Sequence, residues 1–103
     1  MKAGFIGLGH MGMAMAKRLL SQGVDLIVWN RTPEKAKDLG VEIAESPAAL
    51  ASKVNAIIIN LFDSVAVRSV IEGDNGLLSS DIQGKLVIDT TTNHFNDGLR
   101  IPY

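Results

Sequence analysis

Six residues near the start of the chain restrict its fold more than any others. Gly7-Leu8-Gly9-His10-Met11-Gly12 has the spacing Gly-x-Gly-x-x-Gly and follows directly on the apolar run of residues 3–6. Between a strand and a helix, such a turn holds the pyrophosphate of a dinucleotide at the N-terminus of the helix. The first glycine permits the tight turn, the second lets the backbone approach the phosphates, and the third lets helix and strand pack closely. The alternative is a glycine-rich turn that binds nothing.

Composition narrows the class of protein. A chain of 103 residues predicts one domain, and the net charge of −1, with basic and acidic residues interspersed, favours neither nucleic acid nor a membrane surface as a partner. The absence of cysteine excludes a disulfide scaffold, a thiolate metal site and a cysteine nucleophile, and we expect no metal centre. The N-terminus is unlike a signal peptide and no apolar run approaches the length of a membrane span. We therefore expect a cytoplasmic protein.

Apolar runs and helix signals alternate along the whole chain. We expect strands at residues 2–6, 25–29, 41–44, 56–61 and 85–89, and helices at 10–22, 33–39, 47–53 and 64–72. Alternating strands and helices require right-handed crossovers and a parallel sheet. With the glycine turn after the first strand, the pattern predicts a doubly wound, three-layered α/β fold of strand order 3-2-1-4-5. Residues 1–103 are thus interpreted as one Rossmann domain.

The helix starts carry recognisable capping residues. Thr32 and Ser46 each precede a proline, which is the usual signature of an N-cap followed by the first helical position. Asp63 or Ser64 is expected to cap the helix that follows the fourth strand. A short helical turn is expected near Leu77-Leu78, within an otherwise irregular stretch. The helices are expected to stop at Gly23, Gly40 and Gly73.

The end of the second strand predicts which dinucleotide is bound. NAD-binding domains usually place an acid there to hold the ribose 2′-OH, but this chain has Asn30, followed by Arg31 and Thr32. A 2′-phosphate meets no carboxylate at that position, and Arg31 offers planar donors that suit a phosphate and a flat face that suits adenine. We therefore predict NADP as the cofactor, with NAD less favoured. In the alternative interpretation, Arg31 is a solvated loop residue and Asn30 forms a turn.

Residues 4–19, Gly-Phe-Ile-Gly-Leu-Gly-His-Met-Gly-Met-Ala-Met-Ala-Lys-Arg-Leu, closely resemble the opening of the β-hydroxyacid dehydrogenases. That family includes 3-hydroxyisobutyrate dehydrogenase, semialdehyde reductases and 6-phosphogluconate dehydrogenase. The Trp29-Asn30-Arg31-Thr32 run is similar to its NADP-dependent members, and the resemblance extends over essentially the whole chain. It implies an oxidoreductase that transfers a hydride between NADP(H) and a small 3-hydroxyacid or semialdehyde.

The resemblance also implies roles for later residues. Leu61 and Phe62, after the fourth strand, match a segment that lines the cofactor, although members often have proline where this chain has Phe62. Val67 matches a position that commonly packs near the cofactor; a plain core role is the alternative. After the fifth strand, Thr91 stands where the family has a serine that meets the substrate carboxylate. Thr91 and Thr92 are therefore expected to bind substrate, and Thr91 also to lie near the nicotinamide; the alternative is that the consecutive threonines form an ordinary polar strand end.

The resemblance implies that part of the reaction centre is missing. In the family the proton donor is a lysine of a helical C-terminal domain, which would lie beyond residue 103, so we expect a truncated cofactor domain that has no catalytic residue and little or no activity alone. A stand-alone or vestigial NADPH-binding module without catalysis is the alternative. An open reading frame that continues past residue 103 would discriminate between them. Substrate identity and a homo-oligomeric state are left open.

Overall fold

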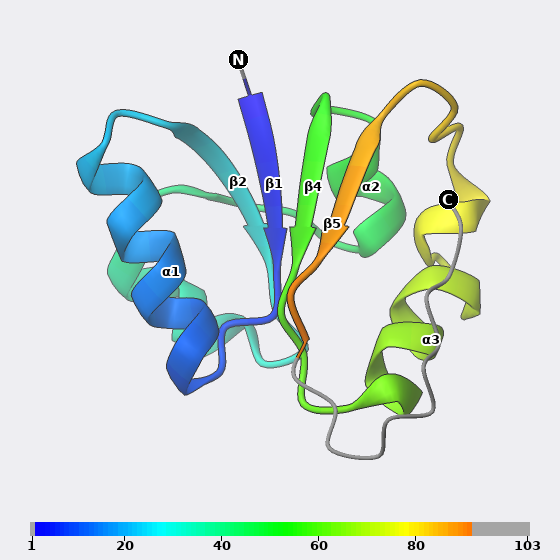
Figure 1. Ribbon diagram of the computed structural model, residues 1–103, viewed down its shortest axis with the longest axis horizontal. Helices are drawn as coiled ribbons and strands as arrows, with labels where there is room; N and C mark the ends of the chain where they lie inside the picture. Colours follow the sequence, from blue (N-terminus) through cyan, green and yellow to red (C-terminus); the bar gives the residue numbers. More distant parts are fainter. Residues whose placement is uncertain (1, 92–103) are drawn as a thin grey trace.

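The computed structural model describes residues 2–91, which form one parallel sheet with helices on both faces (Figure 1). The five strands are β1 (Lys2–Ile6), β2 (Asp25–Trp29), β3 (Glu42–Ile43), β4 (Ala56–Ile59) and β5 (Leu86–Asp89). The α-helices are α1 (His10–Ser21), α2 (Pro47–Ala51) and α3 (Ser64–Glu72), and two 3₁₀ helices are η1 (Pro33–Leu39) and η2 (Leu77–Ser79). The strand order is β3-β2-β1-β4-β5 with every pair parallel. The predicted doubly wound order is confirmed.

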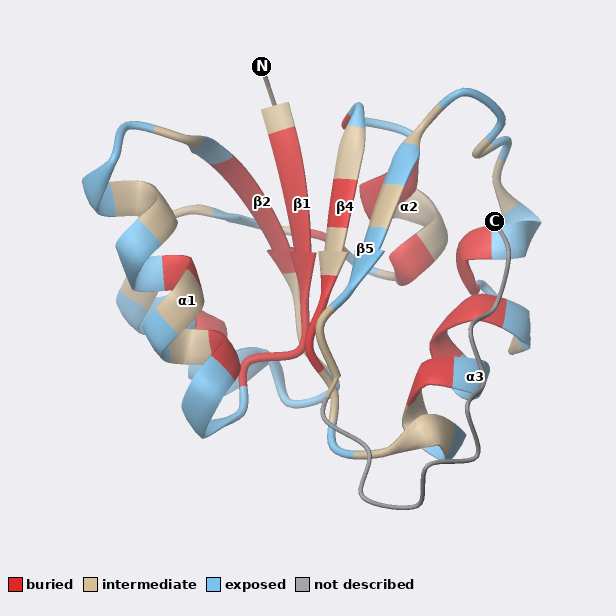
Figure 2. Cartoon of the chain, viewed as in Figure 1, coloured by how far each residue is buried: buried red, intermediate tan, exposed pale blue. Residues whose placement is uncertain are grey.

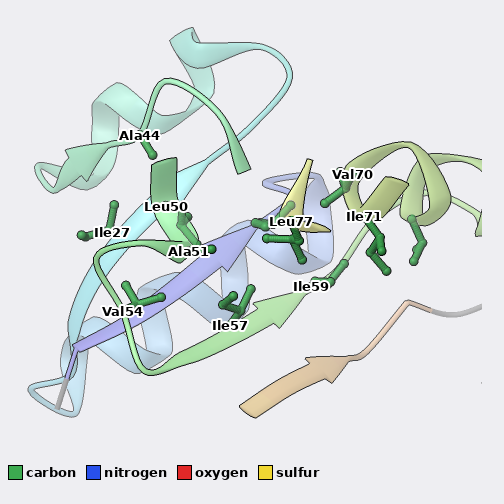
Figure 3. Packing of buried hydrophobic residues seen from close by; sticks show 12 residues of the cluster. Ile27, Ala44, Leu50, Ala51, Val54, Ile57, Ile59, Val70, Ile71 and Leu77 are labelled. Carbon is green, nitrogen blue, oxygen red and sulfur yellow. The ribbon is translucent and has the colours of Figure 1, made fainter. Parts of the chain in front are cut away.

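Alternating side chains of the central strand supply two separate cores, because neighbouring residues of a strand point to opposite faces. Phe5 is fully buried in a cluster that includes Ala16 of α1. Ile6, the next residue, is fully buried in a second cluster with Leu50 of α2 and Ile71 of α3. Figure 2 shows the buried central strands between the helices, and Figure 3 shows the second cluster from close by. The two clusters account for the three layers that the sequence predicts.

The fourth strand is shorter than predicted. It ends at Ile59 rather than at residue 61, although the N–H of Asn60 still donates to the carbonyl of Ile6 (2.9 Å). Asn60 and Leu61 then leave the sheet, because their polar groups bond to the segment after β5. The apolar Leu61 extended the expected strand in the sequence, whereas tertiary hydrogen bonds decide where the strand ends.

The segment after Thr32 is a 3₁₀ helix rather than the expected regular helix. Its first turn is closed by the N–H of Lys35, which donates to the carbonyl of Thr32 three residues earlier (3.2 Å). Thr32 occupies the N-cap position, but among the described residues its side chain makes no capping hydrogen bond. Gly40 ends the segment in the left-handed conformation (φ 67°), as its position predicts.

Two further elements are shorter than expected. β3 has two residues rather than four, although the N–H of Ala44 still donates to the carbonyl of Val28 (2.8 Å). α2 begins at the predicted cap, Ser46, whose hydroxyl oxygen accepts from the N–H of Ala49 (3.0 Å), but it ends at Ala51 because three-residue turns follow. No helix in the described part of the chain is long and apolar enough to cross a membrane.

Candidate dinucleotide-binding site

The three glycines of the turn after β1 do different things in the structure. Gly7 has φ +101°, a conformation that side chains other than hydrogen rarely adopt, and a Cβ there would collide with the backbone oxygen of Asn60. A Cβ at Gly12 would collide with the backbone oxygen of Gly7. A Cβ at Gly9, in contrast, would meet nothing within 4 Å. Gly7 and Gly12 are therefore required by the fold, whereas Gly9 leaves an open space in front of the turn.

That open space lies at the N-terminus of α1. Gly9 is the N-cap residue, and within residues 2–91 no side chain caps the helix and no acid occupies its first turn. His10 and Met11, the first two helical residues, are exposed. The first-turn N–H groups and the positive end of the helix dipole thus face outward, which is the arrangement that binds phosphate. The residues present fit the pyrophosphate of a dinucleotide.

Asn30 connects the end of β2 to the glycine turn. Its Oδ1 accepts a hydrogen bond from the N–H of Leu8 (2.7 Å), and its Nδ2 donates to the carbonyl of Thr32 (3.0 Å). These two partners fix the orientation of the amide, because an acceptor must face Leu8 and a donor must face Thr32. Asn30 thereby fixes the glycine turn relative to the residues that follow β2.

A cavity of about 370 Å³ lies between the end of β2 and α3, and we call it the β2–α3 cavity. Arg31 and Trp29 lie on one wall; Trp29 is the last residue of β2, and Arg31 follows two residues later at the sheet edge where the glycine turn begins. The opposite wall comes from the segment after β4 and from α3. The lining residues include Trp29, Arg31, Leu61, Phe62, Asp63, Ala66 and Ser69.

A second cavity, of about 570 Å³, lies on the α1 side of the glycine turn, and we call it the α1–η1 cavity. Leu8, Gly9 and His10 form one part of its lining. Lys17 of α1 and Lys35 of η1 line it too, so two cationic side chains border the same cavity as the turn. Neither lysine was singled out from the sequence, although Lys35 follows Thr32 by three residues.

Asn60, a residue that the sequence interpretation missed, joins the ends of β4 and β5. Its side chain is 9% exposed, and its Nδ2 donates to the hydroxyl of Thr90 (3.0 Å), whose own proton goes to the carbonyl of Ile59 (2.8 Å). The hydroxyl of Thr91 accepts from the N–H of Leu61 (3.0 Å). A polar residue directly after an apolar strand, as at Asn30, is the signal that identifies Asn60.

Thr90 also borders an apolar cavity of about 430 Å³ between α1 and β4–β5, which we call the α1–β5 cavity. Met11, Met15, Ile58 and Ile88 line most of it. Arg18 and Thr90 are the polar side chains of its lining within the described residues. This cavity lies on the opposite side of the glycine turn from Arg31 and has room for an apolar ring.

The structure brings most of the predicted site residues to one edge of the sheet. The glycine turn, Arg31, Leu61, Phe62 and Thr91 all follow the carboxyl ends of strands. Val67 differs, because it is 3% exposed within the core cluster and does not line the β2–α3 cavity. Thr92 lies outside the described residues. Asp89 accepts the N–H of Thr91 (2.9 Å) and so orders the segment that carries this hydroxyl.

A doubly wound parallel sheet, an uncapped helix after a glycine turn, and cavities on both sides of that turn together define a dinucleotide-binding Rossmann domain. Comparison with known proteins agrees. The family model of the NAD binding domain of 6-phosphogluconate dehydrogenase matches residues 2–102. The chain therefore belongs to this family, and it is an NAD(P)-binding domain of the β-hydroxyacid dehydrogenases.

Individual relatives place the chain among oxidoreductases. It is 39% identical to glyoxylate/succinic semialdehyde reductase 1 of Arabidopsis thaliana over 98% of this chain and 36% of the relative. It is 41% identical to mitochondrial 3-hydroxyisobutyrate dehydrogenase of Mus musculus over 86% of this chain and 28% of the relative. The solved imine reductase from Myxococcus stipitatus in complex with NADP+ has a TM-score of 0.82 and 27% identity over 90% of this chain and 32% of that one. The chain thus spans about a third of the length of its relatives.

Proposed function

We propose that this chain is the NADP-binding domain of an oxidoreductase that transfers a hydride between NADP(H) and a small 3-hydroxyacid or semialdehyde. The observation that carries the cofactor choice is the end of β2, where an amide and a guanidinium stand in place of the usual acid. Glyoxylate/succinic semialdehyde reductase and 3-hydroxyisobutyrate dehydrogenase, named above, support the substrate class.

The 2′-phosphate is held, in this proposal, by the residues that follow β2. Arg31 supplies the paired N–H donors that match phosphate oxygens, and Thr32 supplies a hydroxyl. Lys35, which borders the glycine turn from the α1–η1 cavity, adds a second positive charge. Asn30 contributes through its hydrogen bond to Leu8, because that bond fixes the distance between the pyrophosphate site and the 2′-phosphate site.

The nicotinamide end lies, in this proposal, across the sheet edge near Thr90 and Thr91. Bound NADPH would supply the hydride, and in this proposal the nicotinamide lies beside the apolar α1–β5 cavity, whose lining includes Met11 and Ile88. Thr91, held through its hydroxyl to the N–H of Leu61, faces the substrate carboxylate; Thr92 is proposed to assist it.

Turnover requires a proton donor next to the carbonyl that becomes a hydroxyl. Within residues 2–91, the α1–β5 cavity offers Arg18 and Thr90 as its polar side chains, and neither residue type is among the usual general acids of enzymes. We therefore propose that the 103-residue chain binds NADPH but does not turn over substrate, and that the donor lies in a further domain of a longer protein.

Calorimetric titration of the chain with NADPH and NADH tests the cofactor choice. We expect NADPH to bind more tightly, and Arg31→Ala to weaken NADPH by roughly 10- to 100-fold, because a charge-assisted pair is lost, while NADH changes little. Lys37→Ala is the matched control, because this substitution also removes one positive charge. Lys37 lies in η1 and lines neither cavity beside the turn. Equal affinity of the wild type for both dinucleotides would contradict the proposal.

A further inference from the structure

Phe62 is the most exposed large apolar side chain among the described residues. Its side chain is 90% exposed, compared with 56% for Met11 and 41% for Ile88. An aromatic ring left in water forgoes the favourable burial that usually places phenylalanine in a core. The ring contributes little burial to the described fold, so its apolar face is available to a ligand that binds there.

The backbone on both sides of Phe62 is held by hydrogen bonds. Leu61 donates its N–H to the hydroxyl of Thr91 (3.0 Å), and Asp63 accepts the N–H of Ala66 through Oδ1 (2.9 Å). The side chain of Leu61 also packs against the glycine turn, because a Cβ added to Gly7 would come within 2.8 Å of its Cδ2. The backbone at Phe62 is therefore held next to Leu61, which packs against the glycine turn, while Phe62 itself is exposed.

The ring shares a cavity with a guanidinium. Phe62 and Arg31 both line the β2–α3 cavity, one from the segment after β4 and the other from the segment after β2. β2 and β4 flank β1 on its two sides, so the two residues approach the cavity from opposite sides of the glycine turn. Aromatic rings and guanidinium groups both stack on the flat faces of nucleobases.

We infer that the Phe62 ring stacks on the purine base of the bound dinucleotide, with the Arg31 guanidinium on the other face of the base. This inference rests on the proposed function, since it assumes a nucleotide with its phosphates on the glycine turn. It assigns the contact to the side chain of Phe62, so the affinity of this domain for adenine nucleotides depends on aromatic character at residue 62. The apolar α1–β5 cavity, which Phe62 does not line, is left for the nicotinamide.

The test compares Phe62→Ala, Phe62→Leu and Phe62→Tyr by calorimetric titration with NADPH and with adenosine 2′,5′-bisphosphate. Stacking of a base on an aromatic ring predicts affinity losses of about 5- to 100-fold in the alanine and leucine variants and a change of less than about twofold in the tyrosine variant. The two ligands share the purine end, so their losses should match. Leu78→Ala is the control, because Leu78 is 60% exposed and lies in η2, outside the β2–α3 cavity.

The single tryptophan provides a second measurement. Trp29 lines the same cavity, so its fluorescence reports occupancy of the purine end without any added probe. Wild-type affinity in Phe62→Ala and Phe62→Leu, or an equal loss in Phe62→Tyr, would overturn the inference and leave the proposed function intact. A loss for NADPH but not for adenosine 2′,5′-bisphosphate would also overturn it. If the wild type binds neither ligand, the proposed function itself fails.

Discussion

Two helices of this domain begin at the same edge of the sheet and treat their first-turn N–H groups in opposite ways. α1 begins after Gly9, and within the described residues no side chain caps it. α3 begins after Asp63, whose Oδ1 accepts the N–H of Ala66 (2.9 Å). Both helices follow a parallel strand that ends at that edge, so their dipoles point the same way relative to the sheet.

The difference shows how one residue selects the helix that receives a phosphate. A carboxylate at the N-cap satisfies one first-turn donor and places a negative charge where an anion would bind. Glycine at the same position leaves the donors and the space to the ligand. Because its N-cap is glycine, α1 forgoes only about a few tenths of a kcal/mol relative to a good side-chain cap. The domain thus keeps one helix start open for its ligand and closes the other for stability.

Gly9→Asp gives α1 the same kind of N-cap as α3, and we expect it to have the largest effect on NADPH affinity. Gly9 has an extended backbone (φ −68°) and space for a Cβ, so aspartate should cap α1 and leave the unfolding free energy unchanged or a few tenths of a kcal/mol higher. Its carboxylate would oppose the pyrophosphate, and we expect NADPH affinity to fall by at least about 100-fold in calorimetric titration.

Gly9→Ala separates charge from size in that experiment. The added methyl group meets nothing within 4 Å in the fold but occupies the space in front of the turn. We expect an intermediate loss, about 10-fold, with a melting temperature close to that of the wild type. NADPH binding to Gly9→Asp as tightly as to the wild type would show that the phosphates are not held at the start of α1.

Asp63→Ala tests the closed helix start. Loss of the cap should lower the unfolding free energy by about 1 kcal/mol, which corresponds to a fall in melting temperature of roughly 4–8 °C in thermal unfolding followed by circular dichroism. NADPH affinity should be retained or rise, because a carboxylate leaves the wall of the β2–α3 cavity. Ser46→Ala, which removes the corresponding cap of α2 away from that cavity, should give a similar thermal shift. Weaker NADPH binding in Asp63→Ala would contradict the view that the start of α3 serves stability and the start of α1 serves the ligand.

Local sequence signals predicted most of the fold. Gly7, Gly12 and the strand alternation are local features, and each has the conformation or contact that its position implies. The ends of β4 and the 3₁₀ character of η1 were missed, because they depend on partners distant in the chain or on the closure of a single turn. Hydrogen bonds that join residues 30 positions apart, as between Asn60 and Thr90, leave no periodic signal.

The residues of the candidate site also divide into those that local sequence signals predict and those that only the fold brings together. The glycine turn and Arg31 were identified from spacing, whereas Lys17 and Lys35 reach the turn only through the packing of η1 against α1. Val67 shows the converse, since a position inferred from the resemblance is occupied by a core side chain. Spacing along one element can be read from the sequence, but convergence of separate elements on one cavity requires the fold.

The smallest effect is expected for the ion pair between Glu42 and Lys53. This pair is remote from the starts of α1 and α3, so its loss should change stability slightly and NADPH affinity not at all. Lys53 Nζ lies 2.6 Å from Glu42 Oε2, and both side chains are about half exposed. The hydrogen bond and charge of Lys53 lower the pKa of Glu42, and those of Glu42 raise the pKa of Lys53. The pair therefore stabilises the fold between about pH 5 and pH 10.

Outside that interval the contribution of the ion pair to stability disappears. Glu42 sets the acid limit and Lys53 sets the alkaline limit. As the pH falls through the lowered pKa of Glu42, the carboxylate is protonated, and as the pH rises through the raised pKa of Lys53, the ammonium is lost. Glu42→Gln should thus lower the melting temperature slightly at pH 7, by an amount that shrinks as the pH falls through the lowered pKa of Glu42, with NADPH affinity unchanged. Glu72→Gln is the control, because its pair with Arg68 is looser (3.8 Å) and should give no shift. A deficit of Glu42→Gln that stays the same across an acid titration of the melting temperature would mean that packing, rather than charge, accounts for the contribution of Glu42.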